Sequence, residues 1–118
     1  MRLPLNPVPS GPPLSFQATP VNSSALRLTW EPPAAEQRNG IIRGYLINAT
    51  ALETGEHFQW MSPNAMPLVV SRLHPNYNYN FIITAVSIGP GQFSDVHSVQ
   101  MPEDGNYFFV TSERLMLG

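Results

Sequence analysis

Hydrophobic and polar residues alternate along several short stretches of the chain, and the clearest of these begins at Tyr79. Successive side chains of a β-strand point to opposite faces, so a strand with one buried face is apolar at every second position. The pattern predicts a central strand whose apolar set faces the core. That set is Tyr79, Phe81, Ile83 and Ala85, and the alternating set is Asn80, Ile82 and Thr84.

Six further stretches show the same period, with turn-forming residues between them. They lie near 14–19, 26–30, 42–51, 57–61, 68–70 and 94–101. We expect Pro20 to end the first strand, because proline donates no hydrogen bond to a sheet. We expect Trp30 and Tyr45 to point inward from the second and third strands. Before the third strand, the pair Asn39-Gly40 is typical of a turn.

Seven short strands with turns between them and no helical periodicity predict an all-β fold. The expected architecture is a seven-stranded Greek-key β-sandwich of immunoglobulin-like type. We expect Gly89-Pro90-Gly91 to form the loop before the last strand. In that strand Val96 and Val99 are an odd number of residues apart and would face opposite sides, which a β-bulge would explain. With 118 residues and no cysteine, the chain is long enough to bury a core without disulfides.

The two ends of the chain differ from its middle. Residues 1–10, with prolines at positions 4, 7 and 9, predict an extended linker, and residues 11–103 hold the predicted domain. Residues 104–118 are expected to be a C-terminal linker or extension. Their segment Tyr107-Phe108-Phe109-Val110 is more apolar than a linker should be. The tail is therefore a linker or the start of a neighbouring segment, an extra edge strand, or a non-native or alternative end.

Leu73, Pro75 and Tyr79 stand at the start of the clearest strand with a characteristic spacing. Together with the motifs given below, they make residues 9–101 similar to fibronectin type III domains. Those motifs are Pro12-Pro13, Trp30, Pro32-Pro33, Gly44-Tyr45-Leu46-Ile47 and Gly89-Pro90-Gly91-Gln92-Phe93-Ser94. The resemblance implies a structural core that includes Trp30, Tyr45, Leu73 and Tyr79. It also implies that the hydroxyl of Tyr79 bonds backbone upstream across a corner. Tyr77 departs from the family, which usually has a small threonine there.

Composition argues against two classes of ligand. The net charge is −2, and the six basic residues are arginines scattered along the chain, so no basic stripe for nucleic acid is present. No apolar run approaches the roughly 20 residues of a membrane span. Membrane attachment would therefore come only from an anchor elsewhere in a longer parent chain.

Residues whose side chains could take part in catalysis or metal binding do not form a recognisable site. His57, His74 and His97 lack the paired spacing of metal ligands. Ser94, Asp95 and His97 are the residue types of a catalytic triad, but a triad is defined by geometry and not by a linear cluster. We predict that the domain is not an enzyme, with no catalytic, cofactor-binding or metal site and no small-molecule substrate.

Two sequons for N-linked glycosylation are present, Asn22-Ser23-Ser24 and Asn48-Ala49-Thr50. We expect Asn22 in a turn. Asn48 alternates with the inward residues of its strand, so it is expected to point outward. Both asparagines could carry a glycan without opening the core. The alternative is that they are ordinary polar surface.

Three aliphatic residues are expected to point outward from two neighbouring strands: Leu46, Ile82 and Val86. Our hypothesis is that they form an apolar patch beside Asn48 that contacts a partner protein or an adjacent domain. Scattered aliphatic residues on a surface are the common alternative.

The resemblance implies a non-catalytic extracellular module of a multidomain cell-surface receptor or adhesion protein. The loop and strand sequences of the chain are similar to those of tandem modules in neural adhesion molecules and receptor-type tyrosine phosphatases. Such a module would act as a spacer and a protein-interaction domain, with a protein partner or neighbouring modules, and would be a monomer in isolation. The alternative is an intracellular structural module of a muscle-type or scaffold protein. A catalytic pair of His97 and Asp95 is a distant third.

Overall fold

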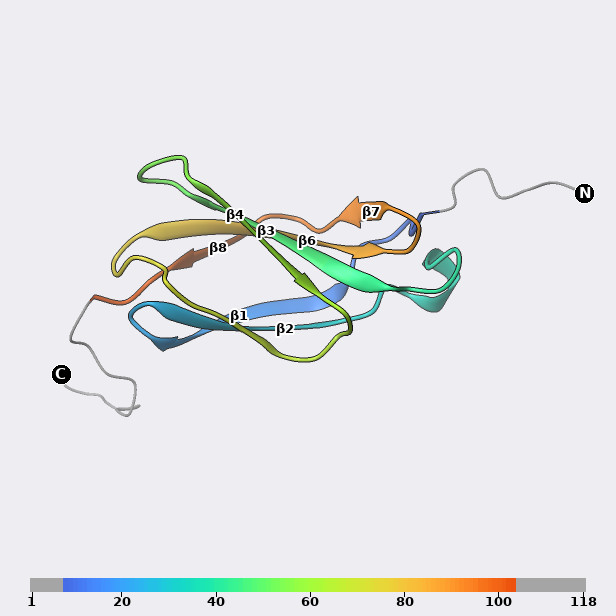
Figure 1. Ribbon diagram of the computed structural model, residues 1–118, viewed down its shortest axis with the longest axis horizontal. Helices are drawn as coiled ribbons and strands as arrows, with labels where there is room; N and C mark the ends of the chain where they lie inside the picture. Colours follow the sequence, from blue (N-terminus) through green and yellow to red (C-terminus); the bar gives the residue numbers. More distant parts are fainter. Residues whose placement is uncertain (1–7, 104–118) are drawn as a thin grey trace, which may run out of the picture.

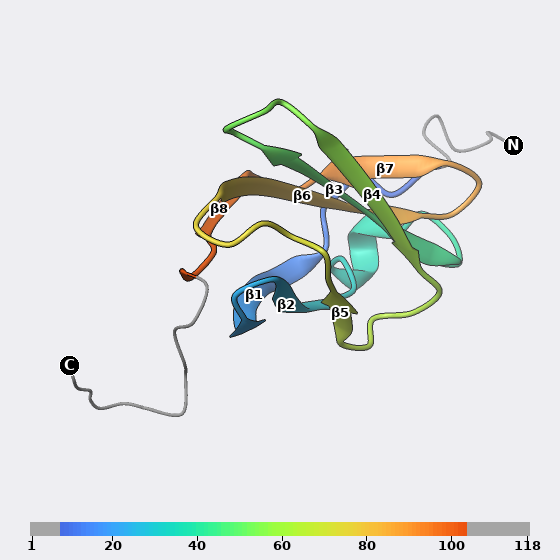
Figure 2. The ribbon, with the colours of Figure 1, turned by 60° about the vertical axis from the view of Figure 1, so that its left-hand side comes forward.

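The computed structural model describes residues 8–103, which form two antiparallel β-sheets packed face to face (Figure 1). The smaller sheet has the order β1-β2-β5, and β5 lies beside β2 on the side away from β1 (Figure 2). Its strands are β1 (Leu14–Asn22), β2 (Ala25–Glu31) and β5 (Leu68–Val70). The predicted all-β sandwich is therefore confirmed.

The larger sheet has the order β4-β3-β6-β7, and β8 also pairs with β6. Its strands are β3 (Gly44–Ala51), β4 (His57–Ser62), β6 (Asn78–Val86), β7 (Pro90–Phe93) and β8 (His97–Gln100). A short 3₁₀ helix, η1 (Ala35–Gln37), lies between β2 and β3. After it, Asn39 and Gly40 both have positive φ, as the predicted turn requires.

The core lies between the sheets and is built from the inward positions of each strand. The Trp30 ring of β2 meets the Tyr45 ring of β3 edge-on, with 5.5 Å between centroids. Across the gap, the Phe16 ring of β1 lies 6.4 Å from the Phe81 ring of β6, and the two rings are tilted by 50°. Each large buried apolar side chain stabilises the fold by about 1.5–3 kcal/mol. The buried set includes Leu26, Leu28, Trp30, Tyr45, Ile47, Val70, Leu73, Tyr79, Phe81 and Ile83.

The last strand, expected near 94–101, is β8 alone and begins at His97, so its predicted start is wrong. A separate strand, β7, precedes it, and a break at residues 94–96 divides the two. At the break the hydroxyl of Ser94 takes part in the pairing of the main chain. Its Oγ accepts a hydrogen bond from the backbone N–H of Ile83 at 3.1 Å and donates one to the carbonyl of Asp95 at 2.9 Å. Beyond the break, β8 pairs with β6 in a register shifted by one residue. Val96 lies in the break and is 58% exposed, whereas Val99 of β8 packs against the core, so only Val99 belongs to the inward set.

Three further predicted boundaries are wrong. Pro20 does not end the first strand, since β1 continues to Asn22 and Pro20 lies opposite Leu26. Proline is tolerated there because β1 is an edge strand. Gly89-Pro90-Gly91 is not all loop, because β7 begins at Pro90. The third strand begins at Gly44, two residues later than expected.

The first residue of β1 also departs from the simple alternation. Leu14 is 42% exposed, although Phe16 two residues later is buried. Ser15 between them has φ of 56°, and the register of β1 against β2 shifts at this point. The positive φ turns Leu14 away from the face that Phe16 occupies.

The corner that leads into β6 is closed by Tyr79. The backbone N–H of His74 donates to the Tyr79 hydroxyl oxygen at 2.7 Å. Burial raises the pKa of this hydroxyl, and the hydrogen bond from His74 lowers it only in part. Leu73 is buried beside the ring at 2% exposure. Tyr77, where the family usually has threonine, is accommodated by stacking on the His74 ring at 4.6 Å.

We expect Tyr79→Phe to lower the free energy of unfolding by about 1–3 kcal/mol, because the His74 N–H loses its acceptor in a partly buried place. The measurement is the midpoint of equilibrium denaturation in urea. Tyr77→Phe is the matched control, since it removes a hydroxyl from the same corner and leaves the His74 bond in place. Equal midpoints for the two variants would contradict this role of the Tyr79 hydroxyl.

Candidate interaction surface

The outer face of the larger sheet is set by the pairing of β3 with its two neighbours. Leu46 lies opposite Met61 of β4 and opposite Thr84 of β6. Ile82 and Val86 lie two residues to either side of Thr84, so both are diagonal neighbours of Leu46. Leu46, Ile82 and Val86 are half-buried, and Met61 is 69% exposed. We call Leu46, Met61, Ile82 and Val86 the outer apolar patch.

The structure thus places the three aliphatic residues singled out in the sequence on one face. Met61 was missed by sequence reasoning. In its own strand Met61 lies on the same face as the polar residues His57 and Gln59, so alternation predicts that it faces solvent. Alternation does not predict which residues of the adjacent strand lie beside it. Only the register of β4 against β3 brings it beside Leu46.

Towards the β3–β4 turn, the same face is polar and its side chains pair across strands. Gln59 donates from Nε2 to Oδ1 of Asn48 at 3.1 Å. The Thr50 hydroxyl lies 3.0 Å from Nδ1 of His57, and further along the Ser98 hydroxyl donates to Asn80 at 2.7 Å. These pairs satisfy one another, and none of their members is Asp, Glu, Lys or Arg. We call Asn48, Thr50, His57, Gln59, Asn80 and Ser98 the outer polar region.

The five strands of the larger sheet contain no Asp, Glu, Lys or Arg. The smaller sheet does expose charge, through Arg27 and Glu31 of β2. A designed or natural soluble surface usually mixes charges of both signs, whereas the core of a protein interface is depleted in them. The uncharged outer face is therefore the part of the described surface that is best suited to being covered.

A shallow depression of about 540 Å³ lies on this face. It is lined by Asn48, Ala49, Thr50, His57, Phe58, Gln59 and Ile82. The depression therefore begins where the apolar patch ends, at Ile82, and extends over Asn48, Thr50, His57 and Gln59 of the outer polar region. Its open shape and neutral lining provide hydrogen-bonding groups around one aliphatic side chain.

The two sequon asparagines lie in different surroundings. Asn48 is half-buried in the middle of β3, and its side chain points outward as expected. Asn22 is exposed at the last position of β1, where its Oδ1 accepts hydrogen bonds from the backbone N–H and the hydroxyl of Ser24 at 2.9 and 3.3 Å. It thus organises the turn between β1 and β2 instead of lying within it.

The three histidines lie apart, and each has a structural neighbour. His57 meets Thr50 on the outer face, His74 stacks on Tyr77, and His97 meets the Phe16 ring edge-on at 4.9 Å. Ser94 bonds main chain at the strand break and makes no triad with His97. Within residues 8–103, no three His, Cys, Asp or Glu side chains are grouped so as to hold a metal ion.

The chain enters the sandwich through a segment that packs between the loop after η1 and the strand β7. Pro9 is completely buried there, and Gly91 lies against it with no room for a side chain. The packed region therefore reaches into the stretch whose composition predicted a linker. Three hydrogen bonds hold it: Ser10 N–H to the Gln37 carbonyl at 2.8 Å, Gln92 N–H to the Pro9 carbonyl at 3.1 Å, and Asn39 Nδ2 to the Val8 carbonyl at 3.0 Å. We call this contact the N-terminal clamp.

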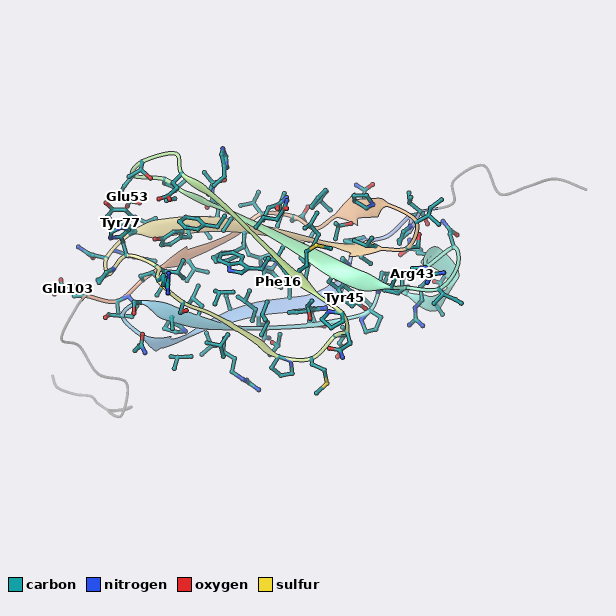
Figure 3. The ribbon with its side chains drawn as sticks, viewed as in Figure 1. Phe16, Arg43, Tyr45, Glu53, Tyr77 and Glu103 are labelled. Carbon is teal, nitrogen blue, oxygen red and sulfur yellow. The ribbon has the colours of Figure 1, made fainter. Side chains whose placement is uncertain are left out.

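The described chain enters and leaves at opposite ends of the sandwich. Arg43 marks the end at which the N-terminal clamp lies, and Glu53, Tyr77 and Glu103 mark the other (Figure 3). At that second end the outgoing chain is tied down by main-chain bonds, Met101 N–H to the Tyr77 carbonyl at 2.8 Å among them. Phe16 and Tyr45 lie between the two layers in the same view.

Glu53 joins the β3–β4 turn to the start of β6. Its carboxylate accepts from the backbone N–H of Asn78 at 3.0 and 3.1 Å and from the Asn78 side chain at 2.9 Å. Desolvation of the carboxyl acts to raise its pKa. The hydrogen bonds from Asn78 outweigh that effect and hold the pKa of Glu53 below its ordinary value.

Comparison with known proteins identifies this architecture. The family model of the fibronectin type III domain matches residues 11–100. The chain belongs to the fibronectin type III family. The fibronectin type III domain is a non-catalytic module, and the relatives match this chain over that region alone.

This chain spans only a small part of the full length of its relatives in sequence. Over 101 residues it is 29% identical to the netrin receptor DCC of Mus musculus, which covers 85% of this chain and 7% of the receptor. Over 99 residues it is 33% identical to the tyrosine-protein phosphatase Lar of Drosophila melanogaster, covering 78% of this chain and 5% of the phosphatase. The crystal structure of the FN5 domain of Drosophila Lar is 32% identical with a TM-score of 0.66, covering 80% of this chain and 98% of that domain.

Fibronectin type III modules of muscle proteins share the fold at lower identity. Domains A168–A170 of titin are 21% identical with a TM-score of 0.68, covering 81% of this chain and 33% of that structure. The twitchin kinase region from C. elegans is 23% identical with a TM-score of 0.72, covering 86% of this chain and 18% of that structure. At these identities the likeness shows the fold alone.

We expect Gly91→Ala to open the N-terminal clamp, because a Cβ at this position would collide with the carbonyl oxygen and ring of Pro9. The cost of such overpacking is about 1–3 kcal/mol. Amide hydrogen exchange should become faster at Ser10 and Gln92. Gly89→Ala is the matched control, since its Cβ would meet Val8 at 3.7 Å, an ordinary contact. Exchange that is the same in both variants would contradict the clamp.

We expect the hydrogen bonds of Glu53 to stabilise the fold at neutral pH and to be lost in acid. The folded pKa is lowered, so the contribution is complete above the unfolded value and disappears as pH falls below 4.5, through the folded value. The melting temperature of Glu53→Gln should therefore differ from that of the parent chain at pH 7 and converge with it in acid. Glu56→Gln, in the same turn, is the control. A difference between Glu53→Gln and the parent that does not change with pH would contradict the assignment.

Proposed function

We propose that this domain is an extracellular module of a multidomain cell-surface receptor or adhesion protein. In that setting it acts as a spacer between neighbouring modules and as a protein-interaction domain. The observation that carries the proposal is the similarity of 29–33% to modules of the netrin receptor DCC and the phosphatase Lar. If the parent is such a phosphatase, its catalysis belongs to a different domain.

The alternative is an intracellular structural module of muscle type. The similarity in fold to titin and twitchin is the reason for considering it. Two features favour the receptor. The sequence identity to receptor modules is higher, and both sequons lie on the surface of the fold, where a glycan does no harm to the core. A cytosolic module has no use for either sequon.

The spacer role rests on how the two ends are held. The chain enters at the N-terminal clamp, leaves at the opposite end, and is bonded to the sandwich at both points. Neighbouring modules would therefore be set apart along the long direction of the domain. The tie at each end restricts the angle at which each neighbour is joined.

The interaction role is assigned to the outer apolar patch. Leu46 is its centre, since it lies opposite Met61 and diagonal to Ile82 and Val86. The absence of charged residues from the larger sheet lowers the cost of desolvating this face. A protein partner or a neighbouring module with its own apolar surface would fit here.

Extracellular placement is tested by peptide mass mapping of the protein from its natural source, before and after enzymatic removal of glycans. We expect a glycan on Asn22 or Asn48, because passage through the secretory pathway exposes both sequons to the transferase. Peptides that contain other asparagines serve as the internal control. Bare asparagines at both positions would favour the intracellular rival.

We expect Leu46→Asp and Val86→Asp each to weaken partner binding by roughly tenfold, as loss of a central interface residue does. The measurement is binding of the secreted domain, fused to a dimerising tag, to cells that carry receptors. The melting temperature should change little, because both side chains are only half-buried. Arg27→Asp, on the outer face of the smaller sheet, is the control. An affinity that is unchanged by both patch substitutions would show that the outer apolar patch is not the interface.

A further inference from the structure

We propose that the depression on the outer face is the seat of the first N-acetylglucosamine of a glycan attached to Asn48. This inference rests on the extracellular placement proposed above. It goes further in giving the depression one occupant and in dividing the outer face into a part covered by sugar and a part left open. Three features of the face lead to it.

The first feature is the position of the acceptor. Asn48 is part of the lining of the depression, not of its surroundings. Its Oδ1 accepts from Gln59 of β4, and the two terminal atoms of an amide point in different directions. The bond therefore engages Oδ1, and it leaves Nδ2, the atom that carries a glycan, to bear the sugar within the depression. Ile82 of β6 lies directly opposite Asn48.

The second feature is the chemistry of the lining. N-acetylglucosamine is a neutral sugar with hydroxyl groups and one acetamido methyl. The depression offers hydrogen-bonding groups from Thr50, His57 and Gln59, and one aliphatic side chain, Ile82. No charged residue lies on the surrounding strands, so seating a neutral sugar desolvates no ion. The acetamido methyl would lie on Ile82, and the ring hydroxyls would face the polar groups.

The third feature is size. A depression of about 540 Å³ lies within the range of about 300–1,000 Å³ that small-molecule sites occupy.

Asn22 provides the contrast, because it is exposed at the end of β1 with its amide oxygen engaged by the turn residue Ser24. A glycan there would project from the turn.

A seated sugar divides the outer face. It covers Ile82 and the part of the outer polar region that lines the depression, and it leaves Leu46, Met61 and Val86 accessible. The open residues lie towards the end of the sandwich where the N-terminal clamp is, because Val86 is opposite Gly44 at the start of β3. Any protein partner of this face would then meet these three residues and one edge of the glycan.

The test uses the whole 118-residue chain secreted from mammalian cells, in two forms that keep one sequon each. Asn22→Gln leaves the sequon of Asn48, and Asn48→Gln leaves that of Asn22. Each glycan is trimmed enzymatically to a single N-acetylglucosamine, and the acetamido methyl is followed by nuclear magnetic resonance. For the Asn48 form we expect an immobilised methyl with a nuclear Overhauser contact to Ile82. The Asn22 form should show a sharp signal of a mobile sugar.

Two further variants separate the seat from the fold. Ile82→Thr keeps a β-branched residue in the strand and removes the outer methyl, so it should release the sugar on Asn48. Val69→Thr, on the exposed face of β5, should leave that sugar immobilised.

The outcomes separate the seat from the proposed function. A sugar on Asn48 as mobile as that on Asn22 overturns the seat, and so does a secreted chain with Asn22 modified and Asn48 bare. Both of these results leave the extracellular placement intact. That placement fails only in the separate mapping of the natural protein.

Discussion

The structure depends on the antiparallel pairing of β3 with β6, which runs from Gly44 opposite Val86 to Ala51 opposite Tyr79. Side chains alternate between faces with a period of two, so a slip of one residue would exchange the core face for the solvent face. The same register therefore fixes which aromatic residues fill the core and which neutral residues meet on the outer face. The Tyr79 hydroxyl and the Glu53 carboxylate both act at the start of β6, where Ala51 lies opposite Tyr79.

The separation of charge between the two sheets follows from that register. The larger sheet supplies the core on one side and a neutral surface on the other, and the charges of the chain lie in turns, at the ends and on β2. A neutral β-surface without a cover is exposed to non-specific association. The cross-strand pairs of Asn48 with Gln59 and of Thr50 with His57 limit that exposure, because they satisfy polar groups within the face. A partner protein and a glycan are two covers that chemistry allows.

Local pattern was enough to predict the sandwich and the inward faces, because strands such as that of Phe81 repeat every two residues. It was not enough where a distant contact decides the outcome. Pro20 continues a strand because β1 is an edge, and Ser94 breaks a strand because its hydroxyl reaches Ile83. For the candidate site, the outward positions of Leu46 and Ile82 followed from alternation, whereas Met61 required the register of a neighbouring strand. Pro9 looked like linker because Gln92, which holds it, lies more than eighty residues away in the chain.

The opposite positions of the two tied ends have a mechanical consequence. A pull applied through the N-terminal clamp and the exit at Glu103 acts along the strands β1 and β8, parallel to their length. Hydrogen bonds loaded in this direction share the force and must give way together, whereas bonds loaded from one end open in sequence. Resistance to such a pull is governed by the rate of unfolding and not by the equilibrium stability. Within residues 8–103, the sandwich is therefore expected to resist a pull most strongly along the line that joins its two tied ends.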